Sequence, residues 1–244
     1  MRVALISDMH GNAVALEAAL DDIRRQDVDQ IVSLGDVAQG GPQPAECLAM
    51  LRDLGCRCVL GNSDEFLFTL DTGSEELDPE ERERVLSVGR WSQEQLSERD
   101  RELIRSFEPT VEFDLGGLRL VCCHGSPRSN EQIVLPETSR DDLRELIGSA
   151  DAVAGGHVHL QWSERLGDKV WFSAGSVGLV WEHKDPLDER PFLPFAEYAL
   201  ASVEDDTVAI EFRRLPFDFQ KVAAAYRSSG MPHAEWFVNQ WQVS

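Results

Sequence analysis

Residues 2–12 read RVALISDMHGN, an apolar run that ends abruptly in polar residues and glycine. The run Arg2–Ile6 predicts a buried β-strand, and the helical spacing of apolar residues over Ala13–Arg25 predicts a helix directly after it. Strand-like runs follow at Gln30–Leu34 and Arg57–Leu60, separated by a helix-like segment over Ala45–Leu54. Because short strands that alternate with helices favour parallel pairing, this region predicts a layered α/β fold.

Residues 65–108 interrupt this alternation. They contain no convincing strand and are rich in charge, which predicts a helical insertion that could cap a site within a single domain spanning residues 1–244. Strand signals then return, with turns expected at Gly116-Gly117 and Asp205-Asp206. The later segments are expected to be strands over Val111–Leu115, Leu118–Cys123, Ala152–Ala154, Val170–Ser173, Ala196–Val203 and Val208–Arg213, a helix over Asp141–Ile147 and a helical tail from Phe217.

The composition excludes several classes of protein. The 244 residues carry 23 Lys and Arg against 44 Asp and Glu, a formal net charge of -21, so binding of nucleic acid through a basic patch is not expected. A hydrophobic content of 42% indicates a globular chain. No apolar run approaches the ~18 residues of a membrane span, and the N-terminal run is too short for a signal peptide. The five cysteines lack zinc-type spacing, so we expect them to be buried and reduced in a cytoplasmic protein.

Polar residues follow five of the apolar runs directly. Because ligands bind at the carboxyl ends of parallel strands, we expect these residues to converge at one edge of the sheet. Residues two apart in an extended chain point to the same side, so each x-spaced pair would present two ligands to one point. The glycines would let the backbone approach the site closely. The five segments are Asp8-x-His10, Gly35-Asp36, Gly61-Asn62, His124-Gly125 and His157-x-His159.

These segments supply two carboxylates, four imidazoles and one amide carbonyl, and no thiolate. Seven ligands exceed what one divalent ion needs, but they suit two ions ~3.5–4 Å apart that share a bridging carboxylate, an arrangement used in phosphoester displacement. Four imidazoles favour Mn, Fe, Zn, Co or Ni over Ca or Mg alone. A metal centre would also provide the positive charge that a chain with three lysines otherwise lacks.

In the order of these segments the chain resembles the calcineurin-like metallophosphoesterase superfamily. The Gly175-Ser176-Val177-Gly178 segment and the compact size are similar to its small prokaryotic branch, and the resemblance covers nearly the whole chain. It implies a four-layer α/β/β/α sandwich and two metal ions, most readily Mn. The first ion would be held by Asp8, His10, Asp36 and His159, and the second by Asp36, Asn62, His124 and His157. A hydroxide between the ions would attack phosphorus, with Asp36, Asn62 and His124 at the catalytic centre.

Two positions depart from the family pattern. Members with strong monoesterase activity carry His after Gly-Asn, where this chain has Ser63, and many carry a second acid where it has Gln39. A serine hydroxyl is a poor general acid, which costs typically ~10²–10⁴-fold with poor leaving groups. We therefore expect a preference for phosphodiesters or pyrophosphate-linked nucleotides, with Asp64 as an alternative proton donor if its pKa is raised.

Two further residues are candidates for contacts with the substrate. Arg128, four residues after His124, is a candidate for binding a phosphate oxygen. Asn12 would either donate to a phosphate or fix its own loop.

Two other functions are open at this stage. The chain could be a non-catalytic metal-binding scaffold of the same fold, with a partner surface built from aromatic residues, or it could be a phosphoprotein phosphatase. Intact ligands argue against a scaffold, and the missing general acid argues against a protein phosphatase. We expect a small phosphoester or nucleotide as substrate and no membrane partner, and the insertion could instead serve homo-oligomerisation. The aromatic residues in question are Phe192, Phe195, Trp236, Phe237 and Trp241.

Overall fold

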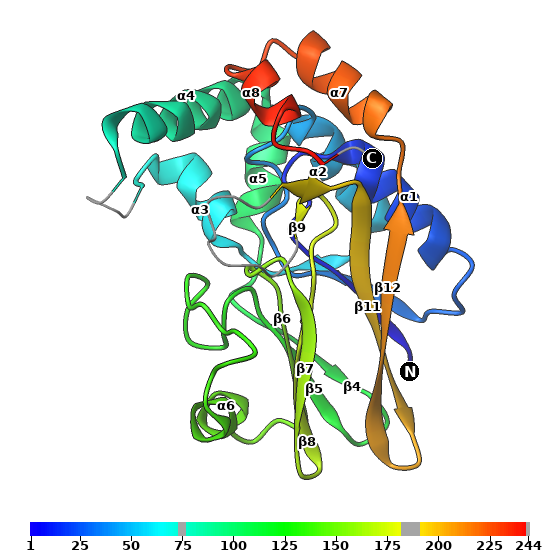
Figure 1. Cartoon of the computed structure of the whole chain (residues 1–244). Coiled ribbons are helices and arrows are strands. Elements are labelled where there is room, and N and C mark those ends of the chain that lie inside the picture. The colour runs from blue at the N-terminus through cyan, green and yellow to red at the C-terminus, as the bar shows by residue number, and fades with distance from the viewer. Residues whose placement is uncertain (73–76, 182–190, 243–244) are drawn as a thin grey trace.

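Two five-stranded mixed sheets form the centre of the protein (Figure 1). The computed structural model describes residues 1–72, 77–181 and 191–242. The first sheet has the order β12-β11-β1-β2-β3, and the second has the order β4-β5-β6-β8-β7. In chain order the strands of the first sheet are β1 (Val3–Ile6), β2 (Gln30–Ser33), β3 (Arg57–Cys58), β11 (Phe195–Glu204) and β12 (Thr207–Pro216). Those of the second are β4 (Val111–Asp114), β5 (Arg119–Cys122), β6 (Ala152–Gly155), β7 (Gln161–Leu166) and β8 (Lys169–Ala174).

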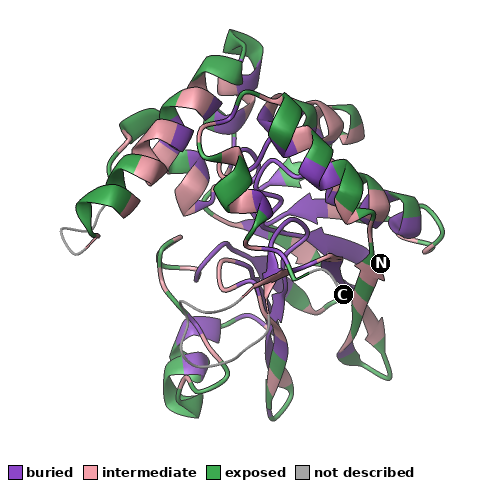
Figure 2. Cartoon of the chain, turned by 45° about the horizontal axis from the view of Figure 1, so that its top comes forward, coloured by how far each residue is buried: buried purple, intermediate pink, exposed green. Residues whose placement is uncertain are grey.

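Helices cover the outer face of each sheet, which gives four layers. Along β1, Val3 and Leu5 pack between the two sheets, whereas Ala4 and Ile6 pack against α1 (Ala13–Ile23) and α2 (Pro44–Leu54). The second sheet is covered by α6 (Arg140–Ile147). Because β1 is buried on both faces, its sequence is a continuous apolar run. Figure 2 shows the buried strands at the centre, with the helices exposed on their outer sides. The predicted α/β/β/α sandwich is confirmed.

A helical cap lies beside the sandwich, at the end where α4 and α8 meet (Figure 1). Three helices lie in the region where a helical insertion was predicted over 65–108, and the first of them begins slightly earlier, at Asn62. That this region is an insertion which caps a site stays a prediction. One apolar cluster joins Val88 of α4 to Tyr226 of α7 and Val238 of α8, so the insertion and the C-terminal tail pack together. The helices of the cap are α3 (Asn62–Thr69), α4 (Pro79–Gln95), α5 (Glu98–Arg105), α7 (Phe219–Ser228) and α8 (Ala234–Val238).

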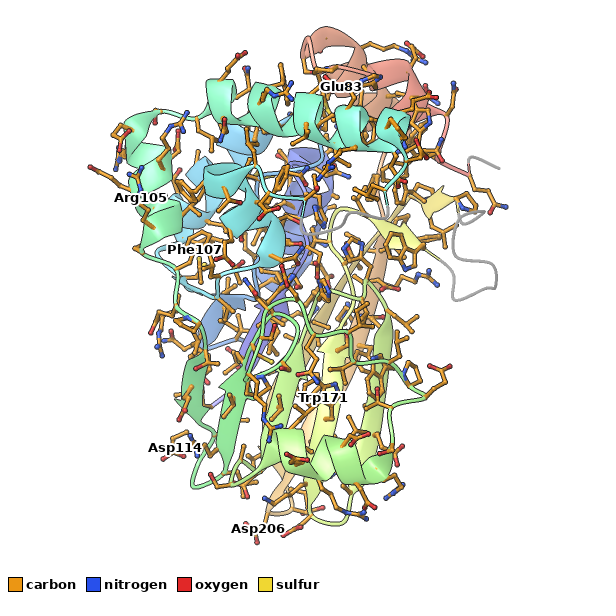
Figure 3. The ribbon with its side chains drawn as sticks, turned by 90° about the vertical axis from the view of Figure 1, so that its left-hand side faces the viewer. Glu83, Arg105, Phe107, Asp114, Trp171 and Asp206 are labelled. Atoms are coloured by element: carbon orange, nitrogen blue, oxygen red, sulfur yellow. The ribbon has the colours of Figure 1, made fainter. Side chains whose placement is uncertain are left out.

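The strand pairing corrects the expected parallel arrangement in part. β1, β2 and β3 pair in parallel, as do β5, β6 and β8, but β11 and β12 in the first sheet, and β4 and β7 in the second, run antiparallel to their neighbours. The sequence reading also missed β7, the hairpin partner of β8. The two predicted hairpin turns are confirmed. Asp114 and Asp206 mark these hairpins at the end of the molecule opposite Glu83 of α4 (Figure 3). This leaves the other ends of the inner strands to form a site.

Two further expectations concern the state of the cysteines and the presence of a membrane-spanning helix. All five cysteines are free thiols, and four of them are buried, whereas Cys56 is half-buried rather than buried as expected. In the described part of the chain, no helix has the length and apolar character that crossing a membrane requires.

Candidate metal centre

All seven predicted ligands lie just beyond the carboxyl ends of parallel strands. Asp8 and His10 follow β1, Asp36 follows β2, and Asn62 follows β3 in the first sheet. In the second sheet, His124 follows β5 and the pair His157 and His159 follows β6. The predicted convergence is therefore present, but two facing sheets contribute to it instead of one sheet edge.

The side chains form two groups. In the first, the ligand atoms of Asp8, His10 and His159 lie within 4.8 Å of one another, and those of Asp36, His124 and His157 do the same in the second. Asp36 faces both groups, since its Oδ2 lies 3.4 Å from His124 Nε2 and 3.7 Å from His10 Nε2.

The Asn62 amide completes the second group. Its Oδ1 lies 2.9 Å from His124 Nε2. The two groups divide the aspartates and histidines in the same way as the two ligand sets that the family resemblance implies. Their role as metal ligands stays a prediction.

The backbone at these positions is in the left-handed region. Asp8, His10, Asp36, His157 and His159 have φ between 45° and 68°, and they make up five of the nine non-glycine residues with positive φ in the described part of the chain. This corrects the expectation that each x-spaced pair lies in extended chain. Such conformations are costly for residues with a side chain, and they concentrate at functional sites where the surrounding structure enforces them.

Close packing of the turns explains two of the glycines. A Cβ on Gly61 would collide with the Asp36 carboxylate, and one on Gly156 would collide with Ser7 Oγ and approach Asp8 Oδ2. These glycines therefore allow the neighbouring turns to bring their carboxylates to the centre, as the sequence predicted.

Backbone carbonyls orient three of the imidazoles. Nδ1 of His10 donates to Gln39 O at 2.8 Å, Nδ1 of His124 to Leu34 O at 2.7 Å, and Nδ1 of His159 to Leu179 O at 2.8 Å. A carbonyl can only accept, so the proton of each neutral ring lies on Nδ1 and the Nε2 lone pair faces the centre. This arrangement is typical of histidines that bind metal ions.

The carboxylates of Asp8 and Asp36 place negative charge between the imidazoles. Asp8 Oδ2 accepts from the His157 backbone N–H at 3.0 Å, but Asp8 Oδ1 is buried without a hydrogen-bond partner, 3.3 Å from His159 Nε2. Burial alone would raise the pKa of Asp8, yet His159 and His124 in their protonated forms outweigh it and keep the pKa below its ordinary value. Burial is likewise outweighed at Asp36, where His124 lowers the pKa.

A buried anionic oxygen without a partner is costly, and His10 Nε2 and His159 Nε2 converge beside it, 3.0 Å apart. A divalent first-row metal ion would neutralise the carboxylate oxygen and bind the imidazole nitrogens, so the residues present fit such ions.

Ser63 and Asp64 support the turn that carries Asp36. Ser63 Oγ donates to Asp36 Oδ2 at 2.7 Å, and its backbone N–H donates to Oδ1 at 2.8 Å. Asp64 accepts from the backbone N–H groups of Asp36, Val37 and Gly61 at 2.8 to 3.2 Å. Burial and the nearby Asp36 raise the pKa of Asp64 to about 7. Its carboxyl group is turned to the backbone, however, so its position does not support the hypothesis that it protonates a leaving group.

The two candidate substrate-binding residues lie away from the centre of the site. Asn12 caps α1 through Ala15 N at 3.1 Å and donates to Gly178 O at 3.0 Å, so both polar atoms of its side chain are used within the protein. Arg128 pairs with Glu145 at 2.9 Å and lines a separate small cavity. Contact of either residue with a substrate stays a prediction.

A cavity of about 330 Å³ opens over the two ligand groups. One side consists of predicted ligands together with Ser63 and Gln39. The opposite wall was not predicted, although the charged insertion and the aromatic tail were possible signals of it. This wall consists of Arg84, Val85 and Val88 from α4, Leu179, Trp181 from β9 (Val180–Trp181), and Trp236 and Phe237 from α8. Trp241, expected at a partner surface, is instead buried beneath the cap.

Comparison with known proteins is consistent with this centre. Residues 1–190, which include all seven predicted ligands, match the calcineurin-like phosphoesterase superfamily domain. An uncharacterized protein of Methanocaldococcus jannaschii is 25% identical over 242 residues, 96% of this chain and 94% of that protein. A metallophosphoesterase structure from Sphaerobacter thermophilus matches with a TM-score of 0.74 at 26% identity, over 98% of each chain. A hypothetical protein from Pyrococcus horikoshii shares the fold, with a TM-score of 0.80 at 16% identity, over 99% of this chain and 98% of that one.

Proposed function

Because this chain belongs to the calcineurin-like phosphoesterase superfamily, we propose that it is a hydrolase that binds two divalent metal ions and prefers phosphodiesters or pyrophosphate-linked nucleotides. The observation that carries the proposal is the buried, unpartnered Oδ1 of Asp8 among inward-facing imidazole nitrogens. The free thiols of the cysteines support a reducing, cytoplasmic location.

The proposed ligand sets share Asp36. Asp8, His10 and His159 would hold one ion together with Asp36, and Asn62, His124 and His157 would hold the other. When bound, the ions supply positive charge for the phosphoryl oxygens and lower the pKa of a water molecule for attack at phosphorus. The mixed nitrogen and oxygen ligands suit Mn, Fe, Zn, Ni or Co, and among these we propose Mn on the strength of the family resemblance.

The protein's own groups define how the substrate would be held. The carbonyl-bound imidazoles and the Ser63 contacts to Asp36 fix the ligand atoms before the substrate arrives, so little reorganisation is needed during the reaction. The cavity above them would place the phosphoryl group against the ligands and leave room for one organic substituent on the side of α4 and α8.

The substrate preference follows from Ser63. Its hydroxyl lies within hydrogen-bonding distance of Asp36 Oδ2 and is a weak acid, so it does not protonate a departing alkoxide. Leaving groups that are already acidic, such as a phenolate or a nucleotide phosphate, need no such proton.

The test combines metal analysis with hydrolysis assays. We expect two Mn²⁺ per chain and hydrolysis of a bis-aryl phosphate that stops on chelation and returns with Mn²⁺. Asp36→Ala should lose both metal and turnover, whereas Asp53→Ala, an exposed carboxylate on α2, should keep both. Bound metal without turnover of any phosphoester, or turnover that survives Asp36→Ala, would refute the proposal.

A further inference from the structure

The cavity has a second side whose chemistry the metal centre does not explain. We propose that Arg84, Trp236 and Phe237 form a subsite for the base of a nucleotide whose phosphate lies at the ligand groups. This inference rests on the proposed function, because it assigns the organic part of the substrate to the wall facing those ligands. The same cavity is lined by His10, Asp36 and His157 on one side and by the three subsite residues on the other.

Trp236 and Arg84 have the properties of a base-binding pair. Trp236 is 41% exposed, and the Arg84 guanidinium lies over its ring at 4.1 Å from the centroid. An exposed tryptophan stacked under a guanidinium offers a planar, polarisable surface, and such surfaces bind bases through their π-faces. The rings of Phe237 and Trp236 are nearly perpendicular, with centroids 4.9 Å apart, and this contact holds the indole in place.

Arg84 places a positive charge beside the cavity. Acidic residues outnumber basic ones by 44 to 23 in the sequence, yet within the described ranges the contact of the Arg84 guanidinium is the Trp236 ring and not a carboxylate. A comparable pair outside the cavity behaves differently. Arg105 lies 5.2 Å from the ring centroid of exposed Phe68, but its guanidinium is paired with Glu98 at 2.7 Å. Among the residues that the structure describes, Arg84 therefore differs from Arg105 in having no carboxylate partner, and it lies beside the cavity where an anionic substrate would arrive.

Trp181 serves a different purpose. One face of its ring stacks on His159 at 4.5 Å, and it also stacks with Phe192 at 6.1 Å. The ring is thus used to position His159 within its ligand group and is less available for a base. This leaves Trp236 as the exposed aromatic of the wall.

The opposite flank of the metal centre disfavours an anionic substituent. A second cavity adjoins Asn62 and is lined by the carboxylates of Glu65 and Glu131, with Asn130 donating to Glu65 at 3.0 Å. A phosphate-bearing substrate would be repelled there and attracted by Arg84. The acidic residues beside Asn62 and the positive charge of Arg84 therefore favour a substrate that extends toward α4 and α8.

The experiment compares two product-like probes that differ only in the base. Adenosine 5′-monophosphate and ribose 5-phosphate are titrated into the Mn²⁺-loaded protein by calorimetry, with quenching of tryptophan fluorescence as a second readout. We expect the nucleotide to bind about tenfold more tightly. In Trp236→Ala the ratio of the two Kd values should fall to about two or below, and in Trp236→Phe it should be intermediate.

Phe68→Ala is the matched control, because it removes an exposed aromatic residue under an arginine outside the cavity, and it should keep the native ratio. Equal affinities of the two probes for the native protein, or an unchanged ratio in folded Trp236→Ala, would overturn the subsite alone. Absence of binding of both probes together with absence of Mn²⁺ uptake would overturn the proposed function as well.

Discussion

The ligand side of the cavity consists of turns that directly follow strands, whereas the opposite wall consists of side chains from α4 and α8, which are far apart in the sequence. Five of the seven predicted ligands are buried, and backbone groups orient several of them, as at Asp8 and His124. The wall ranges from buried Val88 to exposed Trp236, and packing among side chains such as Trp236 and Phe237 holds it. Under the proposed function, the reaction would depend on groups fixed by the backbone of the sandwich, and substrate selectivity would depend on helices whose side chains can vary without disturbing those groups.

The largest expected effect comes from breaking the ligand side at Asp8. Asp8→Asn removes the charge, and we expect loss of hydrolysis on the order of 10³-fold, because Lewis-acid stabilisation is worth several kcal/mol. The metal-free variant should nevertheless be more stable. Its new amide can donate toward His159, where the unpartnered Oδ1 now lies 3.3 Å away. A gain of about 1 kcal/mol corresponds to about 2–4 °C in Tm for a chain of this size.

The Tm of the native protein and of Asp8→Asn, measured once with chelator and once with Mn²⁺, tests this expected gain in stability. Asp53→Asn serves as the control for a lost surface charge. If the metal-free Asp8→Asn protein melts below the native one, the unpartnered carboxylate is not a source of instability, and the metal assignment loses its main support.

The second effect tests the missing acid. Ser63→His places an imidazole next to Asn62, and we expect kcat to rise by about 10² for alkyl phosphoesters, in line with the usual contribution of general acid catalysis. For aryl diesters the gain should be small, since their leaving groups need no proton. A plot of log kcat against leaving-group pKa should therefore flatten in the variant. Equal gains at every pKa would instead mean that Ser63 affects binding or the contact to Asp36.

The difference between the ligand side and the wall of the cavity also explains why the sequence predicted the positions of the ligands but not those of the wall residues. Asp8 lies two residues after the apolar run that forms β1, so its place depends on local chain order and on the general rule for carboxyl ends of parallel strands. The left-handed backbone at Asp8 and His10 was not predicted, because non-glycine residues adopt it only when tertiary contacts enforce it. The hydrogen bonds from His10 N–H to Asp36 O and from Asp8 N–H to Gly35 O are contacts of this kind.

The wall could not be predicted for a similar reason. Trp236 and Arg84 meet only because Val88 and Tyr226 pack α4 against the C-terminal tail, and no local pattern encodes that encounter. Asp64 illustrates the same limit on a smaller scale. Its raised pKa was anticipated as a condition for acid catalysis, but its three backbone hydrogen bonds depend on how two neighbouring turns are placed.

A smaller effect is expected when the wall loses its charge. Arg84→Gln should lower kcat/KM for a dinucleoside polyphosphate by about fivefold, mainly through KM, because one partly exposed ionic contact is worth roughly 1 kcal/mol. Arg82→Gln is the matched control on the same helix, since Arg82 is exposed and does not line the cavity. A decrease in kcat with unchanged KM would instead mean that Arg84 stabilises the transition state. The wall could then no longer be described as a binding surface separate from the catalytic side of the cavity.

The smallest expected effect is that of ionic strength on kcat/KM, because the charge of the whole protein acts on the approaching substrate. With a net charge of -21, the protein repels anionic substrates, and inert salt screens this repulsion over a Debye length of about 10 Å at 0.1 M. We expect kcat/KM to rise about twofold between low and moderate ionic strength, more for a dianionic substrate than for a monoanionic one. Salt also weakens the attraction to Arg84, so the rise should be larger in Arg84→Gln than in the native protein. A fall in both proteins would show that the local positive charge of the metal centre outweighs the acidic surface even at long range, and that the wall adds little to the field that a substrate meets.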